Sequence, residues 1–183
     1  MHALPLLVAA TLAAPAGPAE RLAPENLLGG PTRTVLRYLE AVRRAGPRVP
    51  SVPRGRAPDA RERDYGGANA LVAPRTLAEI ARREAAGEDH PLAPWREASR
   101  ARVLESFRLV SVRWATRGAA VVTVLERFWE PPAEALARQI SEYLVGRVDG
   151  QWRIVDRRRG GAFDDAAIDA TYAGFFDAPP ATR

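Results

Sequence analysis

The segment that decides the fold runs from residue 102 to residue 158 and reads RVLESFRLVSVRWATRGAAVVTVLERFWEPPAEALARQISEYLVGRVDGQWRIVDRR. Four runs in it are rich in β-branched and aromatic residues, which favour strands because they pack well on a pleated surface. Three breaks separate these runs: a turn ending at Gly118, the pair Pro131-Pro132, and Asp149-Gly150. Asp-Gly is a strong hairpin signal, because a two-residue type I′ turn needs positive φ twice. We therefore predict an antiparallel meander with strands at 107–115, 119–129, 140–148 and 151–157.

Two-residue alternation divides the side chains of each predicted strand between the two faces of the sheet. An antiparallel meander can bury one face and leave the other to solvent. The side chains that alternation groups on one face, strand by strand, are Val110, Val112 and Trp114; Val122, Val124, Glu126 and Phe128; Ile140, Glu142 and Leu144; and Trp152, Ile154 and Asp156.

Amphipathic helices are predicted before and after the sheet segment in the sequence. The first begins near Pro31 and ends before Gly46-Pro47, with an apolar stripe at i, i+3, i+4 and i+7. The second begins at Pro74 and ends at Gly87, and the third begins at Asp164 or Asp165. The apolar residues of these helices are Val35, Tyr38, Leu39 and Val42; Leu77 and Ile80; and Ile168, Tyr172, Phe175 and Phe176.

The amino-terminal residues resemble a secretory signal peptide. Residues 3–12 are apolar and rich in Ala and Leu, and small-x-small cleavage sites follow at residues 14–16 and 17–19. We predict a signal peptide at 1–19, a linker at 20–30 and a periplasmic or secreted protein, with a disordered Ala-Pro arm as the alternative. Residues 48–69 are polar and contain several Pro, Gly and Arg, which predicts a flexible insert.

Composition excludes several classes of function. The net charge is +5, but all 27 basic residues are arginine and most are interspersed with Asp and Glu, so nucleic-acid binding is not predicted. The run Arg157-Arg158-Arg159 is interpreted as a solvated or salt-bridged strand end. The chain has no cysteine, and His90 is its only histidine outside the leader, so we expect no metal and no cofactor. No apolar run after the leader is long enough to span a membrane.

The order of elements resembles the nuclear transport factor 2-like superfamily, which includes SnoaL-like proteins and ketosteroid isomerases. The resemblance rests on the helix segment TVLRYLEAV at 34–42, the following helix and meander, and the ending DGQWRIVD at 149–156. It implies an α+β domain at 31–159, in which amino-terminal helices pack in a strongly curved antiparallel sheet. This cone-shaped, cystatin-like roll would be followed by a carboxy-terminal helix and tail at 160–183.

Such a roll implies an apolar pocket between the helices and the concave face of the sheet. If the face with Trp152 and Ile154 is concave, a carboxylate among apolar side chains has a raised pKa and can act as an acid or base. The catalytic candidates are Asp156, Glu126 and Glu142 as bases, with Tyr38 as the donor to a developing oxyanion. The alternative is that these carboxylates pair with arginines across strands. The pocket candidates are Tyr38, Val122, Val124, Phe128, Trp152 and Ile154.

Two functions remain open from the sequence. The first is an exported, non-catalytic domain that binds a small hydrophobic molecule or a protein partner. The second is a SnoaL-like isomerase, cyclase or dehydratase that uses one of the three carboxylates as its general base. The resemblance also implies a homodimer through the outer face of the sheet, for which Arg113, Trp129, Tyr143 and Val145 are the candidates.

Overall fold

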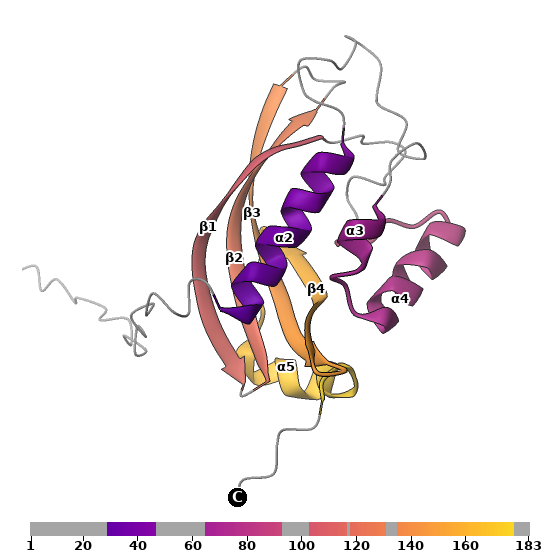
Figure 1. Cartoon of the computed structure of the whole chain (residues 1–183), viewed down its shortest axis with the longest axis vertical. Coiled ribbons are helices and arrows are strands. Elements are labelled where there is room, and N and C mark those ends of the chain that lie inside the picture. Colours follow the sequence, from indigo (N-terminus) through magenta and orange to yellow (C-terminus); the bar gives the residue numbers. More distant parts are fainter. Residues whose placement is uncertain (1–28, 47–64, 93–102, 117, 131–134, 178–183) are drawn as a thin grey trace, which may run out of the picture.

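The computed structural model describes residues 29–46, 65–92, 103–116, 118–130 and 135–177. The predicted signal peptide, most of the linker, residues 48–64 of the insert and Pro131-Pro132 lie outside these residues. The described chain is an α+β domain, as predicted, with helices around a four-stranded antiparallel sheet (Figure 1). Its elements are α2 (Gly30–Ala45), α3 (Gly66–Asn69), α4 (Pro74–Ala85), β1 (Val103–Thr116), β2 (Ala119–Glu130), β3 (Ala135–Val148), β4 (Gln151–Arg159), α5 (Asp165–Tyr172) and the short 3₁₀ helix η4 (Ala173–Phe175).

The sheet is the predicted meander, with strand order β1-β2-β3-β4 and every neighbouring pair antiparallel. The β3–β4 turn is confirmed, because Asp149 and Gly150 have φ of 51° and 72°. The carboxylate of Asp177 accepts hydrogen bonds from the backbone N–H groups of both turn residues, each at 2.8 Å. The end of the described chain is therefore tied to this hairpin.

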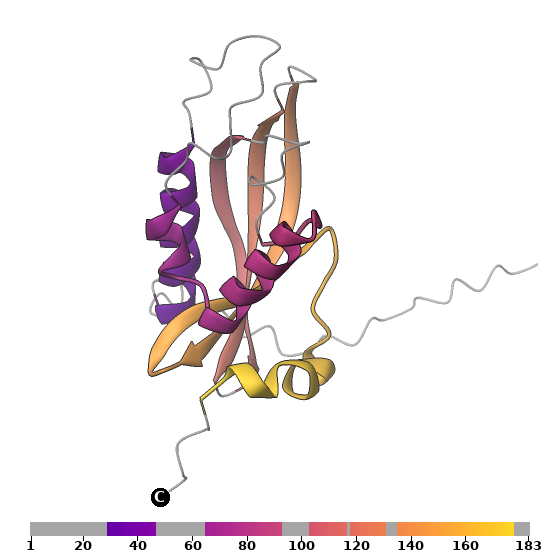
Figure 2. The same ribbon diagram turned by 90° about the vertical axis from the view of Figure 1, so that its right-hand side faces the viewer.

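Helix α2 packs against one face of the sheet, which we call the inner face (Figures 1 and 2). Pro31 lies in its first turn, and Gly46 follows its last residue. The predicted stripe of Val35, Tyr38, Leu39 and Val42 is buried, and these side chains belong to the main core cluster. From the sheet, this cluster includes Leu104, Val122, Val124, Phe128, Tyr143, Val145 and Ile154.

A second core cluster lies on the opposite, outer face of the sheet. Helix α5 lies at one end of the sheet, near the β3–β4 turn (Figure 2). The predicted stripe of α5 and η4 packs there against Val121 and Leu144, and the backbone N–H of Ala166 donates to the Asp164 side chain at 3.1 Å. The cluster consists of Ala73, Ala119, Val121, Leu144, Val155, Phe163 and Ile168, with Ala115, Val148, Tyr172, Phe175 and Phe176 packed against it.

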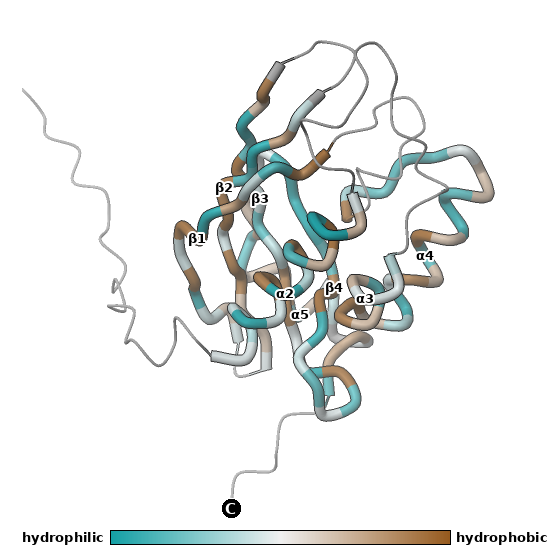
Figure 3. The backbone as a smooth tube through the Cα atoms, turned by 45° about the horizontal axis from the view of Figure 1, so that its top comes forward, coloured by the Kyte–Doolittle hydropathy of each residue, from teal (hydrophilic) through white to brown (hydrophobic). Residues whose placement is uncertain are grey.

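The free edge of β4 is covered by the chain that leads into α4. Ala73 N–H donates to Ile154 O at 2.8 Å, and Ile154 N–H donates to Leu71 O at 2.9 Å. Covering an edge in this way removes unpaired backbone groups that would otherwise bind another strand. Helix α4 follows, with hydrophobic and hydrophilic residues alternating along it (Figure 3) and Ile80 buried in the main core. No helix among the described residues is long and apolar enough to cross a membrane.

The described strand pairs contain four register irregularities, and two of them, at Val110 and Val155, move predicted side chains to the other face. Leu109 pairs with Val124 and Ser111 with Thr123, so Val110 is an additional residue in β1. In β4, Ile154 pairs with Val145 and Asp156 with Leu144, so Val155 is additional. A bulge exchanges the faces of the residues that follow it. The predictions that Val110 shares a face with Val112, and Asp156 with Ile154, were therefore wrong.

The predicted flexible insert extends too far at its carboxyl end. Residues 65–69 are ordered, and α3 occupies four of them. Tyr65 and Ala68 are buried in the main core, beside α2. The burial of Ala68 holds the segment in a helical conformation despite its two consecutive glycines.

Candidate functional site

The inner face of the sheet carries a buried polar cluster where an apolar pocket was predicted. Its members are Glu126 on β2, Ser141 and Tyr143 on β3, and Arg157 on β4, and none is more than 1% exposed. The Glu126 carboxylate accepts hydrogen bonds from Ser141 Oγ at 2.8 Å, from Tyr143 Oη and from Arg157 Nη2. Arg157 Nη2 also donates to Ser141 Oγ at 3.0 Å. Three strands thus contribute to one ion-pair network.

The segment His90-Pro91-Leu92 closes this cluster from the side of the helices. Arg157 Nη1 donates to Pro91 O at 2.8 Å, and Tyr38 Oη donates to Leu92 O at 2.8 Å. The Tyr38 and Tyr143 rings meet edge to face, with centroids 6.1 Å apart. Leu92 is itself fully buried. Backbone carbonyls and aromatic rings therefore occupy the space above Glu126 that a substrate would need.

The surroundings of Glu126 suit an ion pair better than a general base. Burial raises the pKa of the Tyr143 phenol, which therefore stays protonated and donates to the carboxylate. Arg157 adds a charge-assisted hydrogen bond to the same carboxylate, and such bonds are stronger than those between neutral groups. A proton acceptor must reach the proton that it removes, whereas both oxygens of this carboxylate already accept hydrogen bonds from Ser141, Tyr143 and Arg157.

The structure brings together only some of the predicted site residues. Tyr38 and Glu126 both lie on the inner side, in contact with Tyr143. Of the predicted pocket residues, Trp152 is half-buried, and its ring packs against that of Trp114 with centroids 5.7 Å apart. The remaining pocket candidates Val122, Val124, Phe128 and Ile154 are core residues with at most 1% exposure.

Glu142 and Asp156 lie on the outer face, so the prediction that they share a pocket with Glu126 was wrong. Glu142 accepts from the Arg113 guanidinium at 2.8 and 3.2 Å and from Phe163 N–H at 2.7 Å. Asp156 accepts from Tyr172 Oη, and partial burial raises the pKa of that phenol. Both carboxylates anchor the segment from Phe163 through α5 to the sheet, which is a structural role.

The predicted dimer surface also needs correction. Arg113 faces the outer side, where it also bonds the Asp165 carboxylate at 3.2 Å. Tyr143 and Val145 are fully buried on the inner face, because Tyr143 pairs with Val122 and Val145 with Ala120. Neither residue can therefore contact a partner. The sequence predicts a solvated or salt-bridged strand end at Arg157. The residue is salt-bridged to Glu126, but it is buried rather than solvated, as the central cation of the cluster.

Part of the outer face is apolar and exposed, and we call it the outer patch. Ile140, Val110 and Leu136 are 54%, 48% and 45% exposed. Ile140 pairs with Leu125, which in turn pairs with Arg108. None of the described helices covers this half of the sheet, since α5 is confined to the other end (Figure 2). The outer patch consists of Val110, Leu125, Leu136 and Ile140 with Arg108, Arg127 and Arg138.

The outer patch is cationic. Arg127 Nε lies 3.2 Å from the Glu105 carboxylate, which compensates its charge. Arg108 and Arg138 are exposed, and neither has an ion-pair partner among the residues that the structure describes. Exposed apolar side chains with uncompensated arginines between them are typical of protein interfaces, in which arginine is enriched.

Within the described ranges, no group of three or more His, Asp or Glu side chains could hold a metal ion. No protein-family model matches the sequence, and no curated protein matches it as a relative.

We expect His90 to make stability depend on pH. Its Nδ1 accepts from Leu92 N–H at 3.1 Å, and burial lowers its pKa below the usual 6.5, against a smaller opposing effect of Asp156. The unfolded chain then binds more protons, so stability is lost as the pH falls through about 6.5. In urea unfolding, we expect the wild type to lose more stability than His90→Gln between about pH 7.5 and pH 5.5. An equal loss in both proteins would refute this assignment.

Proposed function

We propose that the chain is an exported, non-catalytic domain that binds a protein partner through the outer patch. One observation carries this proposal: three large apolar side chains, at Val110, Leu136 and Ile140, are about half exposed on one half of the sheet. Several large apolar side chains exposed on one face, with polar residues beside them, mark interaction sites in folded proteins.

The proposal includes a nuclear transport factor 2-like roll, with the sheet curved into a cone around α2. The packing of α2 on the inner face and the bulges at Val110 and Val155 support it, because bulges bend strands and increase their twist. In such a roll the interior is the usual ligand site. Here the buried polar cluster and the segment from His90 to Leu92 occupy that interior.

The enzymatic alternative has less support. An isomerase, cyclase or dehydratase would need a carboxylate that faces a substrate. Glu126 is enclosed by Arg157, Tyr143 and Ser141, and the other two candidates bind Arg113 and Tyr172 on the outer side. A small hydrophobic molecule in the interior is disfavoured for the same reason, because the predicted pocket residues already pack against one another.

The charge of the outer patch indicates the chemistry of the partner. Arg108 and Arg138 would require carboxylates opposite them, while Ile140 and Leu136 would require apolar side chains. We therefore propose a partner surface that combines apolar residues with Asp or Glu. A second copy of the chain, which the family resemblance implies, would place two cationic patches against each other.

Photo-crosslinking in the source organism tests this proposal. A photoreactive phenylalanine analogue at position 140 should give a discrete crosslinked species, because that position would lie inside the interface. The same analogue at Thr171, an exposed position on α5, is the matched control and should give none. Adding Arg138→Glu should abolish the species from position 140. Sequencing the amino terminus of the recovered chain tests export at the same time.

Three outcomes would overturn the proposal. One is an absence of any species from position 140, and another is an equal yield from positions 140 and 171. The third is a species of twice the mass of the chain, which sedimentation of the purified protein would verify as a homodimer. An uncleaved amino terminus on a cytoplasmic chain would overturn the export part alone.

A further inference from the structure

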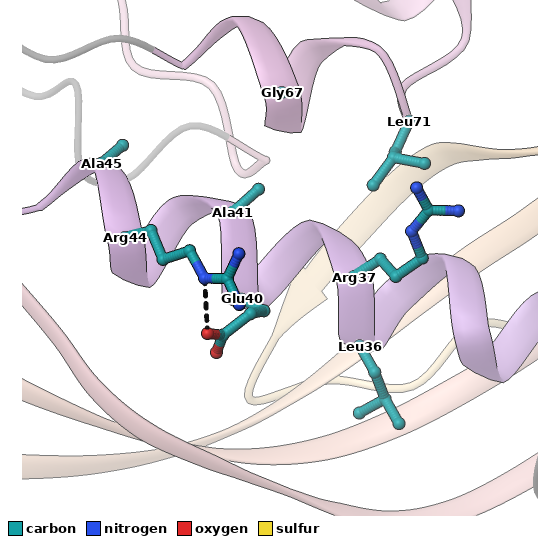
Figure 4. A pocket seen from close by; sticks show the side chains of 8 residues that line it. All are labelled: Leu36, Arg37, Glu40, Ala41, Arg44, Ala45, Gly67 and Leu71. Atoms are coloured by element: carbon teal, nitrogen blue, oxygen red, sulfur yellow. Dashed lines mark hydrogen bonds and ion pairs between the residues drawn. The ribbon is translucent and has the colours of Figure 1, made fainter.

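A second surface feature, an open groove between α2 and α3, has the chemistry of a small-molecule site (Figure 4). It encloses about 830 Å³, which is within the range of sites for small ligands. Its lining comes from α2 and from the segment that includes α3, and consists of Leu36, Arg37, Glu40, Ala41, Arg44, Ala45, Gly67 and Leu71. None of these residues belongs to the outer patch.

Small residues form the middle of the groove. Arg37, Ala41 and Ala45 follow one another at i,i+4 spacing, so they form one row along α2. Gly67 faces the centre of this row, and a Cβ atom added to it would lie 3.9 Å from the Ala41 Cβ. Figure 4 shows the Arg37 side chain extending toward Leu71. A cation at one end therefore adjoins an apolar strip.

The two arginines of the groove differ in their charge balance. Arg44 Nε bonds the Glu40 carboxylate at 2.9 Å, and Arg43 Nε bonds the same carboxylate at 2.9 Å. The Arg43 and Arg44 contacts hold the pKa of Glu40 below its usual value, so Glu40 stays ionised and engaged with them. Arg37 is exposed and has neither a hydrogen bond nor an ion pair within the described part of the chain.

We propose that the groove binds a small amphipathic carboxylate. Its carboxylate would lie on the Arg37 guanidinium, whose parallel N–H donors match the two oxygens of that group. Its hydrocarbon part would lie against Leu71, the apolar side chain toward which Arg37 extends. This site goes beyond the proposed function, because it places a ligand on the opposite side of α2 from the sheet core.

Octanoate is a suitable probe, with octan-1-ol as the uncharged control of equal chain length. We expect an NMR titration of the full chain with octanoate to shift the amide signals of Ala41, Gly67 and Leu71, and octan-1-ol to bind at least about tenfold more weakly. Arg37→Gln should weaken octanoate binding by about tenfold or more, since it removes the charged donor. Arg33→Gln, at an exposed position on the same helix outside the groove, should leave binding unchanged.

A second pair of variants tests the apolar strip. Gly67→Ala should retain octanoate binding, because the added methyl group makes only an ordinary contact with Ala41. Gly67→Leu should abolish binding by filling the groove. Equal affinities for octanoate and octan-1-ol would overturn the proposal, as would an unchanged affinity in Arg37→Gln or an absence of binding to the wild type.

Discussion

Replacing Arg157 by glutamine should lower the free energy of unfolding by about 3–5 kcal/mol, the largest loss expected among the described ion pairs. The reason is that both charges of the Glu126–Arg157 pair are fully buried. Without the guanidinium, the buried Glu126 carboxylate loses its cationic partner, and Pro91 O loses its hydrogen bond from Arg157. Equilibrium unfolding in urea measures the loss.

The double variant Glu126→Gln/Arg157→Gln separates the pair from other effects of substitution. It leaves no uncompensated charge, so its loss should be smaller than the sum of the two single losses by about 1–3 kcal/mol. The exposed pair of Glu40 and Arg43 on α2 is the matched control, and its coupling should stay below about 1 kcal/mol. Additive losses at Glu126 and Arg157 would show that the two side chains do not interact.

Replacing Leu39 by alanine should lower the free energy of unfolding by about 2–5 kcal/mol. Leu39 is fully buried in the cluster between α2 and the inner face, so the substitution leaves a cavity beside the sheet. Leu36→Ala removes the same atoms from the same helix, but Leu36 is only half-buried and lines the groove. Its loss should be clearly smaller. Equal losses, measured by urea unfolding, would contradict the packing of α2 on the sheet.

Much of the fold can be predicted because local signals agree with the tertiary structure. Pro31 and Pro74 both lie in the first turns of the helices predicted from them, and Asp149-Gly150 forms the predicted turn. Each of these signals acts through its own backbone conformation, so it does not depend on distant residues.

The bulges could not be predicted, because nothing in the sequence around them marks an additional residue. Val110 directly follows Leu109 and Val155 directly follows Ile154, so two apolar residues are adjacent at each bulge. At β4 the inner face meets α2 and the outer face meets the second core cluster, so both faces select apolar residues. When both faces are apolar, alternation does not show which residues point to the inner face. Asp156 was therefore predicted on the inner face, although it lies on the outer face.

In β3, too, the sequence does not show which side chains face the inner side of the sheet. Ile140 and Leu144 make one face of this strand apolar, and Tyr143 and Val145 make the other face apolar as well. Only the register with β2, in which Tyr143 pairs with Val122, decides which face is inner. Glu142 was therefore predicted in the pocket, and Tyr143 on the outer surface.

The buried cluster was only half predictable for a different reason. Alternation placed Glu126 on the inner face, and the helix stripe placed Tyr38 opposite it. The partner of Glu126 is 31 residues further along the chain, inside a run of three arginines. An arginine run usually lies in solvent, and the bulge at Val155 is what turns Arg157 inward.

The most direct test of the central claim compares the outer patch with the buried carboxylate in one experiment. The crosslinked species formed from position 140 should persist at wild-type yield in Glu126→Gln/Arg157→Gln, provided that circular dichroism shows the variant to be folded. The yield should fall to background when Arg138→Glu is added instead. A folded double variant that loses the species, with Arg138→Glu retaining it, would place function in the interior and contradict the account.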